Sequence, residues 1–522
     1  MLFNSLTFLI FFVVFGAAYY LARRHLRLQN ALILIGSYIF YGAWDERFLV
    51  LIMASTATDY VCGLGAAGRT PTRRERVVPA AFLAIGSLAV VLPSLEQSWW
   101  VPATTWGAIA GAAVVLPLID SLPAERRRAA YLWASVAVNL GLLGVFKYFN
   151  FFADSLEDLA GLAGITMRPI TLDVILPVGI SFYTFQTMSY TIDIYRRRLE
   201  PTRRFLEVAA FVAFFPQLVA GPIERARNLL PQFFERRTPT PDMIVSGATL
   251  VLWGLFKKVV IADNLAPIAD RAFADPAAMT GPELFAGLLA FTFQIYCDFS
   301  GYSDMARGLA RMLGFEIMLN FNLPYFARTP SEFWQRWHIS LSSWLRDYLY
   351  VPLGGNRRGT LTTYRNLMLT MLLGGLWHGA SWTFVIWGAY HGAILVVYRL
   401  LRVDAWLADS AFRPVRDAAL IAGMFVLTML GWLFFRAQSF TELAAYVSGF
   451  LRDPGLLSAD LGQVLIYIWP LLAVQAVQLY RRELELFPGL PRFARFNVAL
   501  YAGCGLLFMT PEGVAEFIYF DF

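Results

Sequence analysis

Long apolar runs recur along the chain and are separated by short polar loops. The run over residues 6–22 is continuous, and the run over residues 130–152 is interrupted by Asn139, Lys147 and Asn150. Roughly 20 helical residues at ~1.5 Å per residue cross the ~30 Å hydrocarbon core of a bilayer. Further such segments begin near Ala31, Leu49, Val77, Val101, Val174, Met243, Leu284, Leu367, Ala380, Ala418, Val464 and Val498. The pattern predicts an all-α polytopic membrane protein of roughly 11–13 helices, some of them re-entrant or interfacial.

The composition supports this class. Hydrophobic residues make up 58% of the 522 residues and charged residues only 15%, which is more apolar surface than a water-soluble domain normally hides. No basic residue precedes the first apolar run, and Arg23, Arg24 and Arg27 follow it. We therefore expect a retained helix rather than a cleaved signal peptide.

The net charge of +6 is concentrated in short loops that alternate with acidic or neutral ones. If residues 211–222 enter and leave the membrane by the same face, every basic loop falls on one side. The basic sets are residues 23–27, 69–76, 126–128, 196–204, 225–237 and 481–482. This alternation predicts a multi-pass membrane protein with its N-terminus outside and its basic loops in the cytoplasm, rather than a protein that binds nucleic acid.

No internal repeat, low-complexity tract or long hydrophilic linker interrupts the chain. We therefore expect a single membrane domain over residues 1–522. Residues 70–128 look like a peripheral, variable hairpin inserted into it. The candidate chemistry lies in residues 301–401.

Within that region, residues 301–366 contain no apolar run long enough to span. Residues 331–350 read SEFWQRWHISLSSWLRDYLY, and at helical period one face is shared by Phe333, Trp337, Ser340, Leu341, Trp344 and Tyr348. The sequence predicts one amphipathic helix that starts after Pro330 and stops at Pro352. It could be an interfacial helix whose arginines meet lipid headgroups, or it could hold the phosphates of a nucleotide-bearing donor.

Three of the four histidines also fall in this region, as His338, His378 and His391. His338 lies within the amphipathic segment, at the side of the membrane predicted to be cytoplasmic. His378 follows only about ten apolar residues, so we expect it near the middle of the membrane, with glycines around it that let another group approach. A polar side chain at that depth is expected to be functional or to be hydrogen-bonded between helices. We expect His391 to be a supporting residue and His25 to be exposed.

The same residues carry a family resemblance. FWQRWHISLSSWLRDYLY, PLGGNRRG and NLMLTMLLGGLWHGASWTFVIWGAYHG, over residues 333–392, resemble the membrane-bound O-acyltransferases, and among them the bacterial branch concerned with alginate O-acetylation. FFPQLVAGPIERA (214–226), DFSGYSDMARGLARMLGF (298–315) and the terminal FIYFDF (517–522) are similar as well. The resemblance covers nearly the whole chain and is weakest over residues 70–128.

The resemblance implies a ring-like helical fold around a central tunnel, with His378 as the catalytic histidine and His338 as its functional partner. It implies transfer of an acyl group, here acetyl, from a cytoplasmic thioester such as acetyl-CoA or an acyl carrier. The acceptor would be an extracytoplasmic polymer such as alginate. Because the sequence offers no large extracytoplasmic segment to hold a polysaccharide, we expect the acyl group to reach it through a separate extracytoplasmic acetyltransferase. D-alanyl transfer to teichoic acid and O-acetylation of peptidoglycan remain alternatives.

Acyl transfer to an alcohol needs a base that accepts the hydroxyl proton during attack. We expect a neutral His378 to be that base and His338 to orient the donor or to donate to the oxyanion. An acyl-histidine relay and, in another class, a transporter or flippase with histidine proton relays stay open. Further candidates for donor binding are Trp337, Arg336, Ser340, Arg346, Asp347 and Trp377. We expect no bound cofactor, and the widely spaced cysteines predict neither a disulfide framework nor a metal site.

Overall fold

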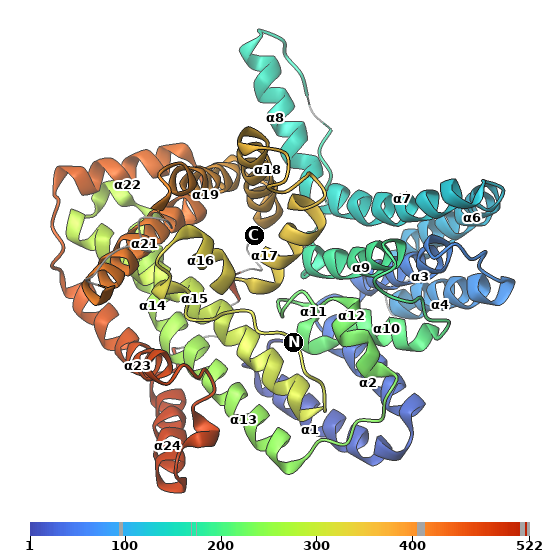
Figure 1. The fold of residues 1–522 in the computed structure, drawn as a ribbon, viewed down its shortest axis with the longest axis horizontal. Helices are drawn as coiled ribbons and strands as arrows, with labels where there is room; N and C mark the ends of the chain where they lie inside the picture. The colour runs from blue at the N-terminus through green and yellow to red at the C-terminus, as the bar shows by residue number, and fades with distance from the viewer. Residues whose placement is uncertain (93–97, 169, 174, 404–412, 512–516, 519–522) are drawn as a thin grey trace. The chain divides into compact units, whose positions relative to one another are not determined.

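The structure is a computed structural model that describes residues 1–522 except 93–97, 169, 174, 404–412, 512–516 and 519–522. All regular elements among these described residues are helical (Figure 1). Nine of the helical segments described are long and apolar enough to cross a membrane, and the predicted all-α polytopic class is confirmed. These segments are Leu6–Arg24, Glu46–Ala66, Trp100–Asp120, Ala124–Leu162, Pro241–Ala274, Gly281–Met312, Trp382–Leu400, Pro414–Arg436 and Ala459–Arg481. The segment expected from Val174 begins at a residue outside the described ones. Most of the terminal FIYFDF motif also lies outside the described residues.

The chain folds into two compact units, residues 1–243 with 310–317, and residues 244–309 with 318–522. The single domain over residues 1–522 and the ring around a tunnel stay predictions. The first unit contains α1 (Leu6–Leu21), α2 (Leu26–Gly42), α3 (Leu49–Ala66), α4 (Arg73–Val91), α6 (Trp100–Asp120), α7 (Ala124–Leu143), α8 (Phe149–Leu162), α9 (Ile180–Tyr195), α10 (Phe205–Ala213), α11 (Phe215–Leu218) and α12 (Ala226–Leu229).

A buried polar cluster joins α3, α7 and α9 at the centre of this unit. The carboxylate of Asp59 on α3 accepts hydrogen bonds from Asn139 (2.9 Å), Thr191 (3.2 Å) and Ser135. Ser55, also on α3, donates to Asn139 at 2.7 Å. Since a buried carboxylate is costly unless hydrogen-bonded, this network fixes how the three helices face one another.

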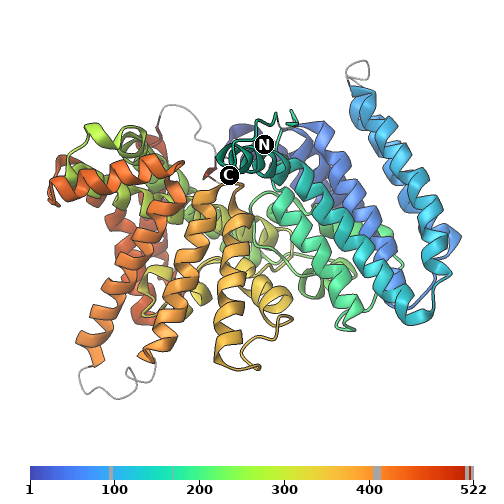
Figure 2. The same ribbon diagram turned by 90° about the horizontal axis from the view of Figure 1, so that it is seen from above.

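Residues 70–128, for which the sequence predicts a peripheral hairpin, contain α4 and α6, which lie side by side (Figure 2). α4 begins with a capping box, in which Thr72 and Glu75 satisfy each other's backbone N–H groups. α4 packs against α3, whereas the spanning segment of α6 is largely unburied within the structure. A hairpin with one unburied helix has few packing partners to constrain its sequence.

The second unit contains the region of the three histidines. Its elements are α13 (Pro241–Leu255), α14 (Asp263–Ala274), α15 (Gly281–Met312), α16 (Pro330–Arg336), α17 (Ile339–Leu345), α18 (Thr360–His378), α19 (Trp382–Leu400), α21 (Arg413–Arg436), α22 (Phe440–Arg452), α23 (Ala459–Arg481) and α24 (Arg492–Phe508). A π-helical stretch, Phe256–Ala262, links α13 to α14.

Glycines bring α13 and α15 into backbone contact in this unit. A Cβ added at Gly254 would lie 2.5 Å from the carbonyl oxygen of Gly301, and one added at Gly301 would lie 2.7 Å from that of Gly254. Two turns further along the pair, Gly308 meets the carbonyl of Gly247 in the same way. Helices inside a bilayer gain little from the hydrophobic effect when they associate. Close packing at small residues stabilises their contact instead.

We predict that Gly301→Ala lowers the stability of the purified protein by about 1–3 kcal/mol, because the new methyl group forces apart two backbones that cannot yield locally. Thermal unfolding in detergent measures this as a lower midpoint. Gly423→Ala on α21 is the matched control, since no atom lies within 4 Å of an added Cβ there. Equal midpoints for Gly301→Ala and Gly423→Ala would contradict the packing argument.

Candidate active site

His378 is the last residue of α18, which packs along α19 in an antiparallel pair (Figure 1). The pair is close because Gly375 faces the carbonyl of Phe384, and a Cβ there would lie 3.1 Å from the Cα of Gly388. The sequence predicted only about ten helical residues before His378. This length is wrong, because α18 starts at Thr360 and has 19 residues. Its first turns are polar but helical, and counting only apolar residues missed them, so the argument for mid-membrane depth no longer holds.

The single helix predicted over residues 331–350 is also wrong. α16 ends at Arg336, the backbone turns at Trp337, and α17 begins at Ile339. His338 between them has φ of +43°, in the left-handed region that favours glycine, asparagine, aspartate and histidine. The chain breaks because it pairs with residues 320–322: Ile339 N–H donates to the Asn320 carbonyl, and Asn322 N–H donates to the Arg336 carbonyl, both at 2.9 Å.

The side chain of Asn320 orients His338. Its Oδ1 accepts from the Ser340 backbone N–H (3.2 Å) and from the Ser340 hydroxyl (2.9 Å), and it lies 3.2 Å from Nδ1 of His338. A backbone N–H can only donate, so the Asn320 atom at this point is the oxygen. The tautomer with its proton on Nδ1 is the one that fits this oxygen acceptor, and it leaves the lone pair on Nε2.

His338 is 0% exposed, as is Asn320. Burial lowers the pKa of His338 to about 3, because an apolar environment disfavours the charged imidazole. The ring is thus neutral at physiological pH. The helix break turns this side chain into the interior. The place of His338 at the cytoplasmic face of the membrane stays a prediction.

The imidazoles of His338 and His378 lie in one enclosure. Their ring centres are 6.4 Å apart, and the indole of Trp377 lies 6.0 Å from the first and 5.0 Å from the second. A ring nitrogen lies only about 1.2 Å from its ring centre, so the two rings cannot share a direct hydrogen bond of ~3 Å. The separation is suited to a reacting group held between them.

Edge-on aromatic contacts complete the enclosure. Phe299 meets His338 at 4.7 Å, while Trp387 and Phe435 meet His378 at 5.0 and 5.4 Å. His378 is only 4% exposed. Such surroundings exclude water and strengthen any electrostatic interaction formed inside.

His391 lies outside this enclosure but touches its wall. It packs 4.7 Å from Trp387 and is bounded by Phe333 and Trp334. Among the residues described, neither of its nitrogens has a hydrogen-bond partner. Its supporting role stays a prediction. His25, by contrast, is exposed, as the sequence predicted.

The other candidate residues divide into two groups. Trp337, Ser340 and Trp377 are buried beside the histidines or in the adjoining aromatic core, where Trp337 packs 4.7 Å from Trp432. The charged candidates are engaged elsewhere. Arg336 bonds Glu332 at 2.7 Å, and Arg346 bonds the neighbouring Asp347 at 2.8 Å. Nothing in these contacts brings Arg336, Arg346 or Asp347 to the imidazoles.

Sequence reasoning missed Asn320, Phe299, Trp387 and Phe435. The available signal for Asn320 was a polar residue directly before the Phe-Asn-Leu-Pro-Tyr-Phe motif of residues 321–326. Phe299 lies within the DFSGYSDMARGLARMLGF motif, and Trp387 lies one turn before His391. Phe435 belongs to an apolar run in which aromatic residues have no distinguishing spacing.

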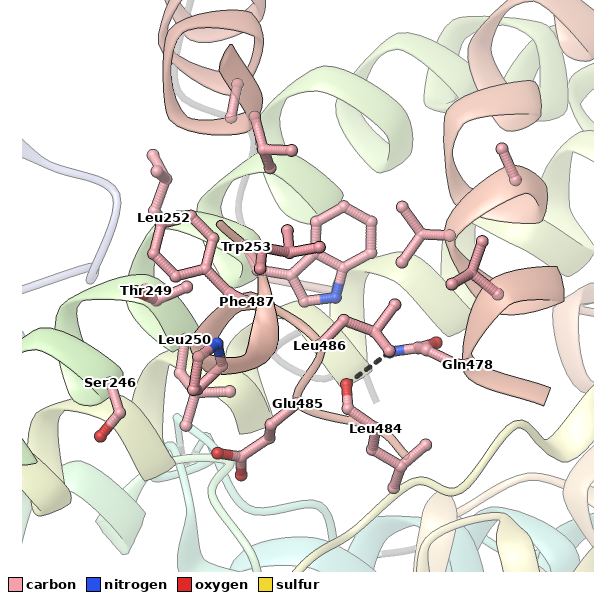
Figure 3. Close-up of a pocket in the computed structure, with 17 residues that line it drawn as sticks. Ser246, Thr249, Leu250, Leu252, Trp253, Gln478, Leu484, Glu485, Leu486 and Phe487 are labelled. Atoms are coloured by element: carbon pink, nitrogen blue, oxygen red, sulfur yellow. Dashed lines mark hydrogen bonds between the residues drawn. The ribbon is translucent and has the colours of Figure 1, made fainter. Parts of the chain in front are cut away.

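A separate cavity of about 360 Å³ lies between α13, α23, α24 and residues 484–490 (Figure 3). Its walls are apolar, and Trp253, Leu486 and Phe487 project into it. None of the three histidines lines it. A smaller, polar cavity shares Trp253 and Glu485 with it and reaches Phe321, which packs 5.0 Å from Phe299. Because no histidine lines the apolar cavity, it is distinct from the histidine enclosure.

Comparisons with known proteins identify related sequences. The family model described as MBOAT, membrane-bound O-acyltransferase family, matches residues 196–440, a range that contains all three histidines. AlgI of Azotobacter vinelandii, described as a probable alginate O-acetylase, is 45% identical over 442 residues, which are 84% of this chain and 76% of that protein. The peptidoglycan O-acetyltransferase of Helicobacter pylori is 37% identical over 369 residues, 66% and 68% of the two chains. The teichoic acid D-alanyltransferase of Streptococcus thermophilus is 28% identical over 244 residues, 44% and 57%.

A polytopic helical protein with these relatives is an integral-membrane acyl-transfer enzyme. The chain belongs to the membrane-bound O-acyltransferase family. Its activity is that of an O-acyltransferase, as predicted, and the transporter alternative is set aside.

We predict that Asn320→Ala lowers stability by about 1–3 kcal/mol, because the buried N–H and hydroxyl of Ser340 lose their acceptor. Thermal unfolding of the purified protein measures the change. Ser342→Ala is the control, since this hydroxyl is only part-buried and donates to the Trp337 carbonyl at 3.1 Å. An Asn320→Ala protein as stable as the Ser342→Ala protein would show that Asn320 does not hold this turn together.

Proposed function

We propose that the protein moves acetyl from a cytoplasmic thioester, acetyl-CoA, toward an extracytoplasmic acceptor for O-acetylation of a secreted polysaccharide such as alginate. The observation that carries this proposal is the 45% identity with the probable alginate O-acetylase of A. vinelandii over 84% of the chain. The alternating basic loops support an inner-membrane protein with its N-terminus outside and Arg23 to Arg27 in the cytoplasm.

In the proposed mechanism, His378 is the general base. The acceptor hydroxyl attacks the thioester carbonyl carbon while a ring nitrogen of His378 takes the hydroxyl proton. The new C–O bond forms, the C–S bond breaks, and the imidazolium returns the proton to the departing thiolate. The water-poor aromatic enclosure around His378 supports this role, because a neutral imidazole is the form that can accept a proton.

His338 then orients the donor. With its Nδ1 proton held by Asn320, Nε2 bears a lone pair and accepts a hydrogen bond, for example from an amide N–H of the pantetheine arm. A neutral imidazole in this tautomer presents no N–H on its other side, so the Asn320 contact favours orientation of the donor over donation to the oxyanion. The 6.4 Å between the two ring centres leaves room for the thioester carbonyl.

The immediate acceptor in this proposal is a hydroxyl on a separate extracytoplasmic transferase, which then modifies the polysaccharide. In the part of the chain that the structure describes, all regular elements are helices of the two units, and none forms a further domain that could hold a polymer. The lower identity to the peptidoglycan O-acetyltransferase, 37%, makes peptidoglycan the second candidate acceptor.

We predict that His378→Ala abolishes acetylation, with a fall of at least about 10³-fold, because the attacking hydroxyl loses its base. Acetyl content of the secreted polysaccharide in a complemented deletion strain measures this, and the muropeptides of the same strain report on peptidoglycan. Membrane insertion and the unfolding midpoint should stay near those of the unaltered protein. His25→Ala, at an exposed histidine, is the control. Near-normal acetylation by His378→Ala would remove the catalytic assignment.

We predict that the purified protein, reconstituted in vesicles with labelled acetyl-CoA and alginate but no partner, transfers little label to the polymer. The reason is that the acceptor hydroxyl belongs to the partner. Adding an extract that contains the extracytoplasmic transferase should restore labelling. Efficient direct acetylation of alginate by the protein alone would overturn the relay while leaving the O-acyltransferase activity intact.

A further inference from the structure

The first unit contains a hollow of about 840 Å³ that the proposed chemistry does not use. It lies where the turn after α1, the middle of α3, the start of α4 and the start of α10 come together. Arg24 ends one candidate membrane span, and Tyr60 belongs to another. The hollow therefore lies beside the last residue of one candidate span and the second half of another.

Six arginines and two glutamates line this hollow. Both glutamates are already engaged: Glu75 pairs with Arg203 at 3.3 Å and caps α4, and the buried Glu207 lies 3.9 Å from Arg204. Within the described part of the chain, the other four arginines of the lining make no ion pair. These are Arg24, Arg27, Arg74 and Arg236. Four positive charges around one concavity repel each other and lack a counter-charge from the protein.

The same hollow has an apolar wall. Leu26, Val78, Phe205 and Leu206 contribute to its lining, and Val78 is 42% exposed. A soluble anion would leave this wall in contact with water. A phospholipid would cover it with its glycerol and the first carbons of its chains, while its phosphates met the guanidinium groups.

We propose that this hollow binds a ligand with two phosphates, and that the source is the headgroup of an anionic diphosphate lipid of the cardiolipin type. Guanidinium groups bind phosphate oxygens in bidentate fashion, which makes arginine clusters well suited to such headgroups. The size of the hollow exceeds what one phosphate needs. Basic pockets between spanning helices at the cytoplasmic surface are the usual setting for lipids of this kind.

The site is independent of the acyl-transfer proposal, because its residues lie in a different unit from the three histidines. A soluble diphosphate nucleotide has the same phosphate chemistry and is the alternative source. The apolar wall and the position beside two candidate membrane spans favour the lipid. The two sources are separated by offering each one alone.

The test uses the full chain purified in neutral detergent, with cardiolipin, phosphatidylcholine and adenosine diphosphate as separate probes and native mass spectrometry as the readout. We expect cardiolipin to bind and to be retained better than phosphatidylcholine, and adenosine diphosphate to show no binding that depends on the hollow. The double variant Arg27→Gln with Arg74→Gln should weaken cardiolipin binding about tenfold or more.

The matched control is Arg23→Gln with Arg73→Gln, which removes the same charge from adjacent, exposed arginines outside the lining. It should leave cardiolipin binding within about twofold of the unaltered protein. A second lining pair, Arg24→Gln with Arg236→Gln, covers the case in which the first variant unfolds, and thermal unfolding identifies that case. Equal losses in the lining and control variants would overturn the site in favour of general surface charge. Binding of adenosine diphosphate in place of cardiolipin would overturn the lipid as its source.

Discussion

One side-chain oxygen, that of Asn320, holds the candidate active site in its shape. It accepts from the N–H and hydroxyl of Ser340 and from His338, while the backbone on either side of it pairs with residues 336–339. These bonds satisfy polar groups that would otherwise be buried without partners. They also break a segment whose pattern favours one helix, turn its histidine inward and set the proton on one nitrogen. Shape, burial and tautomer of His338 thus have a common cause.

Elsewhere in the fold, buried polar groups and closely packed helices likewise find their partners within the protein. In the first unit, Asp59 draws hydroxyl and amide donors from α7 and α9 around one carboxylate. In the second, Gly254 and Gly301 bring two backbones together, and Gly375 with Gly388 does the same for α18 and α19. Helices in a bilayer gain little from hiding apolar surface against each other, so hydrogen bonds and close packing define their neighbours. The rigid pair of α18 and α19 in turn positions His378.

Sequence reasoning succeeded where the signal is local. Apolar runs located the spans and predicted the all-α polytopic class that the structure has. It failed where a residue far along the chain decides the outcome. No periodicity reveals that Asn320 interrupts the helix at His338, and hydropathy does not register the polar first turns of α18. The two histidines were recognised from their motifs, whereas the aromatic residues that enclose them come from separate helices and have no common spacing.

The left-handed backbone at His338 has a consequence for how this position is interpreted in any substitution series. Most residues with a Cβ pay a conformational cost at φ of +43°, and branched ones pay the most. An alanine there removes an imidazole and strains a turn at once, so its effect has two origins. Asparagine tolerates this backbone region and retains a polar side chain, so it alters the proton chemistry while preserving the turn. A replacement for His338 must therefore first tolerate the left-handed backbone, and only then does its acid–base character decide the effect.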